Sequence, residues 1–321
     1  MPRLFNAVFF LACAAAVWAA DANTDDDKPG SRPVGGYVPE KSLAAAALAA
    51  YTLSGLVHSY YFFAVPPRRW FICALPLGMF AMAIGFGIRI AYSNGPPYSL
   101  GVYIITTLFI LLSPCLYLAT DYMILSHLAQ NFDDEVSKRC LAISHSRITK
   151  IFVWADISTF LIQSAGGGLT ASKEIKTADL GSKLALVGLT LQAVSFGLFT
   201  VVLIVFAWRM SKLYPQLWYP KNPRPFKVFS RQPIDDWRII IYLMLVTCVG
   251  ILVRSIFRII EFAGGYRGAV YTHEWYFYAF DTLPLWLSMT VFAIVWPTRA
   301  IMKRGENIEL SSTQSFAKGS A

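Results

Sequence analysis

Seven long apolar runs are the feature that most constrains this 321-residue chain. They cover residues 43–65, 70–92, 101–125, 151–170, 184–208, 239–262 and 274–297. Each run reaches or approaches the ~20 residues with which a helix crosses a hydrocarbon core of ~30 Å. Charged residues make up 15% of the chain, whereas a soluble domain carries about 25%. The sequence therefore predicts an all-α, polytopic membrane protein whose single domain, residues 43–297, is a bundle of seven transmembrane helices.

The two ends of the chain have a different composition. Residues 1–20 hold one basic residue, an apolar stretch and small residues before Asp21, which is typical of a secretory signal peptide and too short for a good span. The alternative for this segment is an uncleaved membrane anchor. Residues 21–42 are polar with several Gly and Pro, so we expect a disordered extracellular segment. Residues 298–321 are polar and Ser-rich and are predicted to form a cytoplasmic tail.

The distribution of basic residues predicts the orientation. If the N-terminus lies outside, the segments 66–69, 126–150 and 209–238 and the C-terminal tail all lie inside, and together they hold most of the Lys and Arg. This bias follows the positive-inside rule and predicts an outside N-terminus and a cytoplasmic C-terminus. The net charge of +9 is then a property of the cytoplasmic face, and we expect no nucleic-acid partner.

Charged residues inside the apolar runs are costly and therefore informative. Arg254, Arg258 and Glu261 are spaced i, i+4 and i+7, so they share one helix face. Glu274 and Asp281 are seven residues apart and share a face in the last run. A charge at mid-bilayer costs ~3 kcal/mol even on a lenient scale, so several unpaired charges would prevent insertion. We therefore expect opposite charges to meet inside the bundle.

Other polar residues lie inside the remaining runs. They are Arg89, Asp121, Asp156, Gln163, Gln192 and His58. With the predicted orientation, His58, Asp121 and Asp156 fall in the inner half of the membrane and the others in the outer half. Two roles are open for such a network: it binds the head group of an amphipathic ligand, or it is a structural set of ion pairs that fixes helix packing.

The sequence lacks two patterns that would mark an enzyme. The four histidines include no His-x-x-x-His pair, which argues against a metal-dependent hydrolase. The chain has no phosphate-binding loop, and the glycines at 166–168 lack the lysine and the strand that such a loop needs. We therefore expect no enzymatic activity, no metal and no cofactor.

Several of the polar residues belong to longer motifs. These are DIS at 156–158, QSAGGG at 163–168, FGLF at 196–199, RSIFRIIE at 254–261 and HE at 273–274, followed by Tyr278 and Asp281. With these motifs, residues 37–297 resemble the fungal RTA-like proteins, also called the lipid-translocating exporter family. One position departs from the family pattern, because Met82 stands where the family usually carries Glu, seven residues before Arg89. Any contact that this Glu makes in the family does not carry over to this chain.

The resemblance implies a seven-span protein of the fungal plasma membrane or endomembranes, in a family linked to sphingoid long-chain base release, sterol-analogue resistance and porphyrin uptake. We expect a plasma-membrane translocator or exporter of lipids or amphipathic compounds that confers resistance to toxic amphiphiles, in contact with membrane lipids. The candidate substrate-binding residues are Asp156, Gln163, Gln192, Arg254, Arg258, Glu261, Glu274, Asp281, Arg89 and His58. A cationic amine of a sphingoid base would pair with an acid such as Glu261, Glu274 or Asp281. The alternative function is a seven-span lipid-stress sensor or receptor-like protein.

Overall fold

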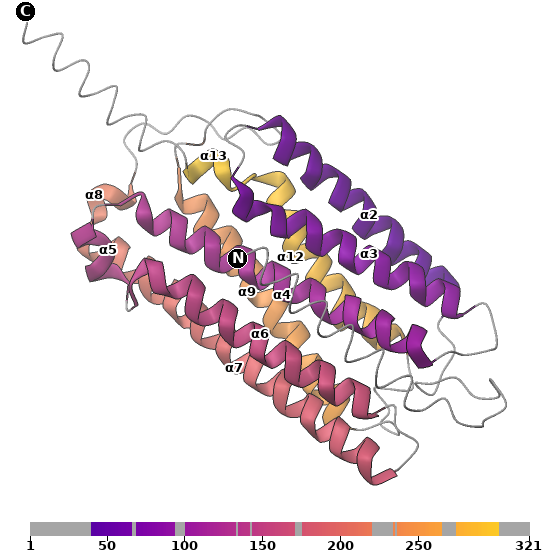
Figure 1. Cartoon of the computed structure of the whole chain (residues 1–321). Coiled ribbons are helices and arrows are strands. Elements are labelled where there is room, and N and C mark those ends of the chain that lie inside the picture. The colour runs from indigo at the N-terminus through magenta and orange to yellow at the C-terminus, as the bar shows by residue number, and fades with distance from the viewer. Residues whose placement is uncertain are drawn as a thin grey trace, which may run out of the picture.

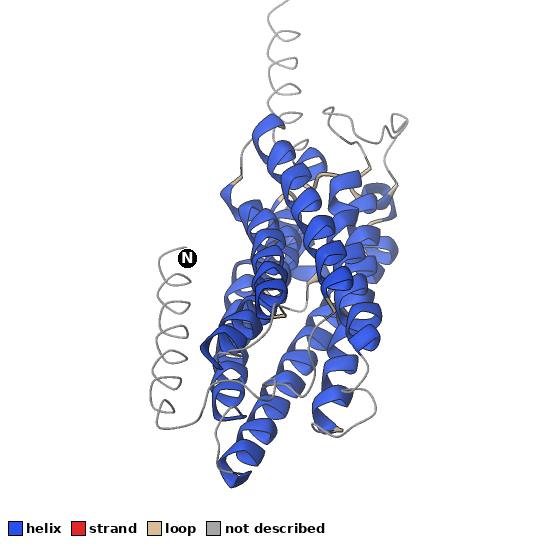
Figure 2. Cartoon of the chain, turned by 90° about the vertical axis from the view of Figure 1, so that its right-hand side faces the viewer, coloured by secondary structure: helices blue, strands red, loops and turns tan. Residues whose placement is uncertain are grey.

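The computed structural model describes residues 40–65, 69–93, 100–132, 134–141, 143–170, 175–219, 234, 236–264 and 274–301. All regular structure in this part of the chain is helical (Figure 2). The predicted signal peptide, nearly all of the segment 21–42 and the tail after residue 301 lie outside the described residues.

Most of the described residues belong to long helices. The long helices are α2 (Lys41–Ala64), α3 (Ala74–Tyr92), α4 (Leu100–Gln130), α6 (His145–Thr170), α7 (Ile175–Leu213), α9 (Arg238–Ala263) and α12 (Leu283–Ile294). The short elements are the 3₁₀ turn η1 (Trp70–Cys73) and the helices α5 (Asp134–Cys140), α8 (Pro215–Trp218), α11 (Glu274–Phe277) and α13 (Thr298–Ile301). The π-helical segment η2 (Tyr278–Thr282) joins α11 to α12, so that α11, η2 and α12 form one continuous rod.

The long helices pack in a closed ring. In ring order, α2 contacts α3, α3 contacts α4, α4 contacts α6, α6 contacts α7, α7 contacts α9, α9 contacts α12, and α12 contacts α2 again. Successive long helices run in opposite directions, and α5, α8 and α13 lie at the same end of the bundle (Figure 1). The described parts of the predicted inside segments 126–150 and 209–238 and the start of the tail thus share one end, and the prediction that this end faces the cytoplasm stays a prediction.

Six helices in the described part are long and apolar enough to cross a membrane. They are Lys41–Ala64, Trp70–Tyr92, Gly101–Gln130, Lys176–Leu213, Arg238–Ala263 and Glu274–Ile294. The helix α6 is long enough but less apolar, because it carries Asp156, Gln163 and three consecutive glycines. The chain is therefore a multi-pass helical membrane protein with six candidate membrane spans in its described part, and a seventh span through α6 stays a prediction.

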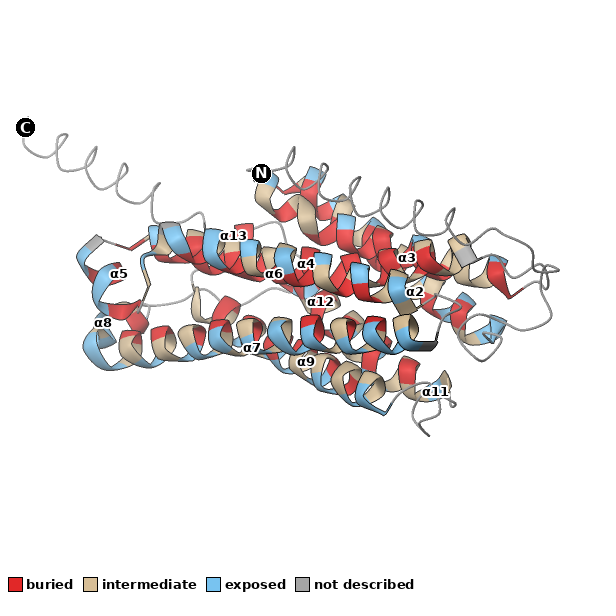
Figure 3. Cartoon of the chain, turned by 60° about the horizontal axis from the view of Figure 1, so that its bottom comes forward, coloured by how far each residue is buried: buried red, intermediate tan, exposed pale blue. Residues whose placement is uncertain are grey.

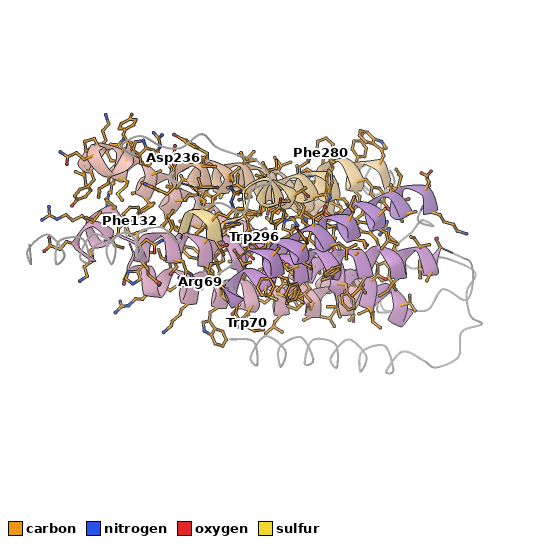
Figure 4. The ribbon with its side chains drawn as sticks, turned by 90° about the horizontal axis from the view of Figure 1, so that it is seen from above. Arg69, Trp70, Phe132, Asp236, Phe280 and Trp296 are labelled. Atoms are coloured by element: carbon orange, nitrogen blue, oxygen red, sulfur yellow. The ribbon has the colours of Figure 1, made fainter. Side chains whose placement is uncertain are left out.

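The outward faces of the ring are apolar. On α7, an exposed stripe repeats every three or four residues, and the opposite face of the same helix is buried (Figure 3). The exposed residues are Val187, Leu191, Val194, Leu198 and Val201, and the buried ones are Phe196, Phe199, Leu203 and Phe206. A helix that is apolar on both faces can expose its outer face to lipid but not to water. Trp70 likewise projects from the edge of the bundle, with 81% of its surface exposed (Figure 4).

Glycines bring α6 and α7 into backbone contact. A Cβ atom built on Gly166 would lie 2.5 Å from the backbone nitrogen of Ala185, and one on Gly181 would lie 2.4 Å from that of Thr170. By contrast, a Cβ on Gly167 would meet nothing within 4 Å. Small residues at such a crossing are a common device of membrane helices. The three consecutive glycines therefore lie within α6 and do not end it, and Gly166 packs against α7.

Several element ends differ from the predicted ones. The helix α7 begins at Ile175 and not at 184, because Lys176 and Lys183 break the apolar run without breaking the helix. Its 39 residues span roughly 58 Å, nearly twice the hydrocarbon thickness. The helix α2 begins at Lys41, inside the segment predicted as disordered. The helix α13 forms a turn at the start of the predicted tail, in which Thr298 and Arg299 are buried.

Candidate functional site

A cluster of four charged side chains lies between α9 and the rod formed by α11, η2 and α12. Asp281 is fully buried, and its Oδ1 lies 2.7 Å from Arg254 Nε and 2.7 Å from Arg258 Nε. Arg258 also donates from Nη2 to Asp281 Oδ2 at 3.1 Å and from Nη1 to Glu261 Oε2 at 2.9 Å. Two arginines and two carboxylates thus neutralise one another. The predicted ion-pair network is present, and its role in ligand binding stays a prediction.

The backbone of the last span is irregular at this cluster. Asp281 belongs to the π-helical segment η2, and Pro284 follows it in the first turn of α12. Proline has no N–H, and its ring clashes with the carbonyl four residues earlier, so a regular α-helix cannot pass through this point. A wider π turn relieves the conflict, and such turns are frequent at functional sites. The interruption lies at the carboxylate that contacts both arginines.

A second ion pair lies beside this cluster. Arg89 on α3 donates from Nη2 to Glu274 Oε1 at 3.0 Å, and the backbone N–H of Glu40 donates to Glu274 Oε2 at 2.7 Å. The Phe277 ring separates the two sets of charges, with the guanidinium of Arg89 at 4.9 Å and that of Arg258 at 5.1 Å from its centroid. Cation–π contacts of this kind strengthen when water is excluded. The side chains of α3, α9 and α11 are therefore joined in one polar assembly. Phe280, which belongs to η2 as Asp281 does, lies toward the opposite end of the bundle from Phe132 and Asp236 (Figure 4).

The two predicted glutamines meet across the contact between α6 and α7. Gln163 donates from Nε2 to Gln192 Oε1 at 2.9 Å, and Gln192 donates from Nε2 to the Cys115 sulfur of α4 at 3.6 Å. The amide pair links three neighbouring helices of the ring. The two side-chain amides hydrogen-bond to each other, and buried amides require such partners.

His58 has backbone partners. One ring nitrogen lies 2.6 Å from the carbonyl oxygen of Ser54 and the other 3.2 Å from that of Met289. The side chain is fully buried between α2 and α12. The contacts of this ring connect two helices, and its role in ligand binding stays a prediction.

Two buried acids stand apart from the arginines. Both carboxyl oxygens of Asp156 lack a hydrogen-bond partner, and Asp121 accepts one hydrogen bond, from Thr247 Oγ1 at 3.0 Å to Oδ2. Neither acid forms an ion pair with a basic residue of the described chain. The sequence placed Asp156 in a neutralised network, and the structure shows no such neutralisation among the described residues.

Sequence reasoning missed three tyrosines and one phenylalanine of the interior. Tyr51 donates its hydroxyl to the carbonyl oxygen of Thr282 at 2.8 Å and interacts electrostatically with Asp281 and Arg254. The hydroxyls of Tyr117 and Tyr122 are buried without a hydrogen-bond partner, and that of Tyr117 also interacts with Arg254. The phenylalanine is the Phe277 described above. The chain contains 16 tyrosines and 23 phenylalanines, so composition gave no means to single these out.

Comparison with known proteins assigns the chain to a family. The family model described as "RTA1 like protein" matches residues 75–304, which run from the second residue of α3 to beyond the end of α13. The chain belongs to the RTA1-like family. The predicted resemblance is therefore confirmed, while α2 with His58 and Tyr51 lies before the matched range.

Relatives of this RTA1-like protein are known in Saccharomyces cerevisiae. Protein RTA1 is 34% identical over 241 residues, which cover 74% of this chain and 70% of the relative. Protoporphyrin uptake protein 1 is 31% identical over 220 residues, covering 68% and 65%. Sphingoid long-chain base transporter RSB1 is 23% identical over 269 residues, covering 76% and 68%. No solved structure matches the chain.

Proposed function

We propose that this RTA1-like protein translocates amphipathic molecules, of the class of sphingoid long-chain bases, across the membrane through the polar interior of a seven-helix ring. The names of two relatives, an uptake protein and a transporter, support transport as the activity. In this proposal α6 is the seventh span, since it occupies one position in the closed ring and turns Asp156 and Gln163 inward, where both are buried.

The observation that carries the proposal is the state of Arg254. Its guanidinium is buried in the ring and contacts Asp281 through Nε, but its Nη2 atom has no hydrogen-bond partner. The unpartnered hydroxyl of Tyr117 interacts with the same guanidinium. Buried donors are almost always satisfied in folded proteins, so an open N–H group here suits the oxygen atoms of a polar head group.

The cationic amine of such a substrate needs a carboxylate that is not already occupied. Glu261, Glu274 and Asp281 each accept a hydrogen bond from an arginine, so an amine would have to compete with a guanidinium there. No guanidinium contacts Asp156, and the Tyr122 hydroxyl is the polar group that interacts with its carboxyl. We therefore move the amine partner from those three acids to Asp156.

Transport in reconstituted vesicles tests this function. The purified chain is placed in vesicles, and the movement of a labelled sphingoid base to the opposite leaflet is timed against protein-free vesicles. Wild-type protein is expected to accelerate the movement. Arg254→Gln is expected to slow it about tenfold or more, because a hydrogen bond to a charged group contributes about 1.5–3 kcal/mol.

Two further variants separate a binding role from a folding role. Arg254→Lys keeps the charge opposite Asp281 but not the open N–H geometry, so it is expected to fold and to remain slow. Arg209→Gln removes an arginine near the end of α7, outside the network, and is expected to leave transport unchanged. Wild-type rates equal to those of protein-free vesicles would refute transport and favour a sensor.

A further inference from the structure

Asp121 on α4 and Asp156 on α6 are buried acids without a basic partner in the described chain. Their exposed fractions are 0% and 3%, and three of their four carboxyl oxygens lack a hydrogen bond. The arginines of the interior are engaged elsewhere, with Asp281, Glu261 and Glu274. Nothing described on α3, α4, α6, α7 or α9 places a cation against either carboxyl.

Tyr122 connects the two acids. Its hydroxyl interacts electrostatically with both carboxyls and more strongly with Asp156, and it makes no well-aligned hydrogen bond. Its ring is held by Phe152, with centroids 5.2 Å apart, and by Phe199, with centroids 4.6 Å apart. Aromatic packing on both sides of Tyr122 keeps this part of the helix bundle apolar and fixes the position of the Tyr122 hydroxyl.

The other titratable groups around the pair are thiols. Cys115 on α4 interacts electrostatically with Asp156, and Cys248 on α9 with Asp121. The guanidinium of Arg254 interacts electrostatically with Cys115, and its ion-pair partner is Asp281. The polar residues that α7 contributes nearby are the uncharged Gln192 and Thr200.

A carboxylate in such a place is unfavourable unless something neutralises it. A proton can do so, and so can the amine of a bound substrate. We propose that Asp121 and Asp156 form a proton-binding pair, and that the exchange of a proton for the substrate's cationic amine at Asp156 couples transport to a proton gradient. The exchange balances charge, since one proton leaves the carboxyl as one ammonium arrives. The coupling rests on the proposed function, whereas the proton site does not.

Thr247 is placed to respond to the charge of Asp121. Its hydroxyl oxygen lies 3.0 Å from Asp121 Oδ2 and 2.7 Å from the carbonyl oxygen of Met244. A hydroxyl has one hydrogen, so it can donate to only one of these acceptors at a time. We expect it to donate to the carboxylate when Asp121 is charged and to the carbonyl when Asp121 carries a proton.

Infrared spectroscopy of the purified protein tests the proton site without any transport. The carbonyl stretch of a protonated carboxyl is followed while the pH is changed, in wild type, Asp121→Asn and Asp156→Asn. Each variant is expected to lose one band that titrates in wild type. Asp179→Asn is the matched control, since Asp179 is exposed and paired with Lys183, and it is expected to keep both bands. If neither Asn variant removes a wild-type band, the proton site is refuted.

Vesicles with a pH gradient test the coupling. The probe is an amphiphile with a quaternary ammonium group, whose charge does not respond to pH, so that passive weak-base distribution is excluded. For one proton per substrate, wild type is expected to change the accumulation ratio about tenfold per pH unit. Asp156→Asn is expected to show no response to the gradient, and Asp156→Glu, which keeps a carboxyl, is expected to retain one.

The two assays distinguish the failures. Wild-type transport that ignores the gradient would refute the coupling. If no amphiphile moves at all while the infrared bands titrate and disappear in the Asn variants, the proton site is supported and the proposed transport function is what fails. An Asp156→Asn protein that still follows the gradient would refute the assignment of the exchange to this residue.

Discussion

Replacing Asp281 with asparagine removes a carboxylate that two arginines contact at 2.7 Å. Glu261 continues to pair with Arg258 in the variant, and Arg254 is left without an ion-pair partner in the described interior. Breaking a buried ion pair by removing one partner costs about 3–5 kcal/mol, because a charge is left uncompensated. We expect a loss of this size in the free energy of unfolding, with the retained asparagine carbonyl recovering a small part.

Glu274→Gln is the matched control for this prediction. Its ion pair with Arg89 is at the margin of the ring, where the side chains of Arg89 and Glu274 are 14% and 11% exposed. Partial access to solvent lowers the cost of an unpaired charge, so we expect a loss of about 1–2 kcal/mol. The free energies are measured by unfolding both variants with dodecyl sulfate in mixed micelles. A loss for Asp281→Asn no greater than that for Glu274→Gln would contradict the assignment of Asp281 as the centre of the network.

Three further changes test the packing around the site. Gly166→Ala is expected to destabilise the bundle by about 1–3 kcal/mol through overpacking between α6 and α7, whereas Gly167→Ala, with open space around it, is expected to be neutral or stabilising in the same unfolding assay. In Gly250→Ala the new Cβ would overlap the Ser288 hydroxyl of α12, so we expect a comparable loss and a slower transport rate as α9 is pushed away from the Asp281 carboxylate. Phe277→Leu removes two cation–π contacts and is expected to cost about 1–2 kcal/mol, while the same change at the more exposed Phe280 should cost under about 0.5 kcal/mol; equal losses would argue against these contacts.

Hydropathy located the long helices well, because a helix that spans lipid needs a long apolar run and such runs rarely occur for other reasons. Each predicted run overlaps one long helix or, for the last run, the rod of α11, η2 and α12. Helical spacing also placed Arg254, Arg258 and Glu261 on one face, and the cost of an unpaired charge required a counter-ion that Asp281 supplies. These inferences depend on one-dimensional periodicity and on solvation, and both can be read directly from a sequence.

The pairing between helices could not be read in this way. The acids and bases inside the runs roughly balance in number, which suggested that all of them meet. In the structure two arginines converge on Asp281, and Asp156 and Asp121 are left without one. Counting charges cannot predict which of them meet, because the pairing depends on how each helix is rotated about its axis in the bundle.

The backbone of the last span was also beyond prediction. A proline such as Pro284 interrupts a helix, but a kink, a bulge and a π turn can all accommodate it, and only tertiary packing selects among them. The choice of a π turn places Asp281 opposite both arginines. For His58, the sequence suggested a ligand contact but could not show that the ring nitrogens lie 2.6 and 3.2 Å from two backbone carbonyl oxygens.

The measurement that bears most directly on this account is the rate at which a labelled sphingoid base crosses vesicle membranes containing the purified protein. We predict that wild type raises this rate above that of empty vesicles, and that Arg254→Lys, although folded, lowers it about tenfold or more. A folded Arg254→Lys protein that moves the base as fast as wild type would show that the buried guanidinium holds the helices together and does not handle the substrate.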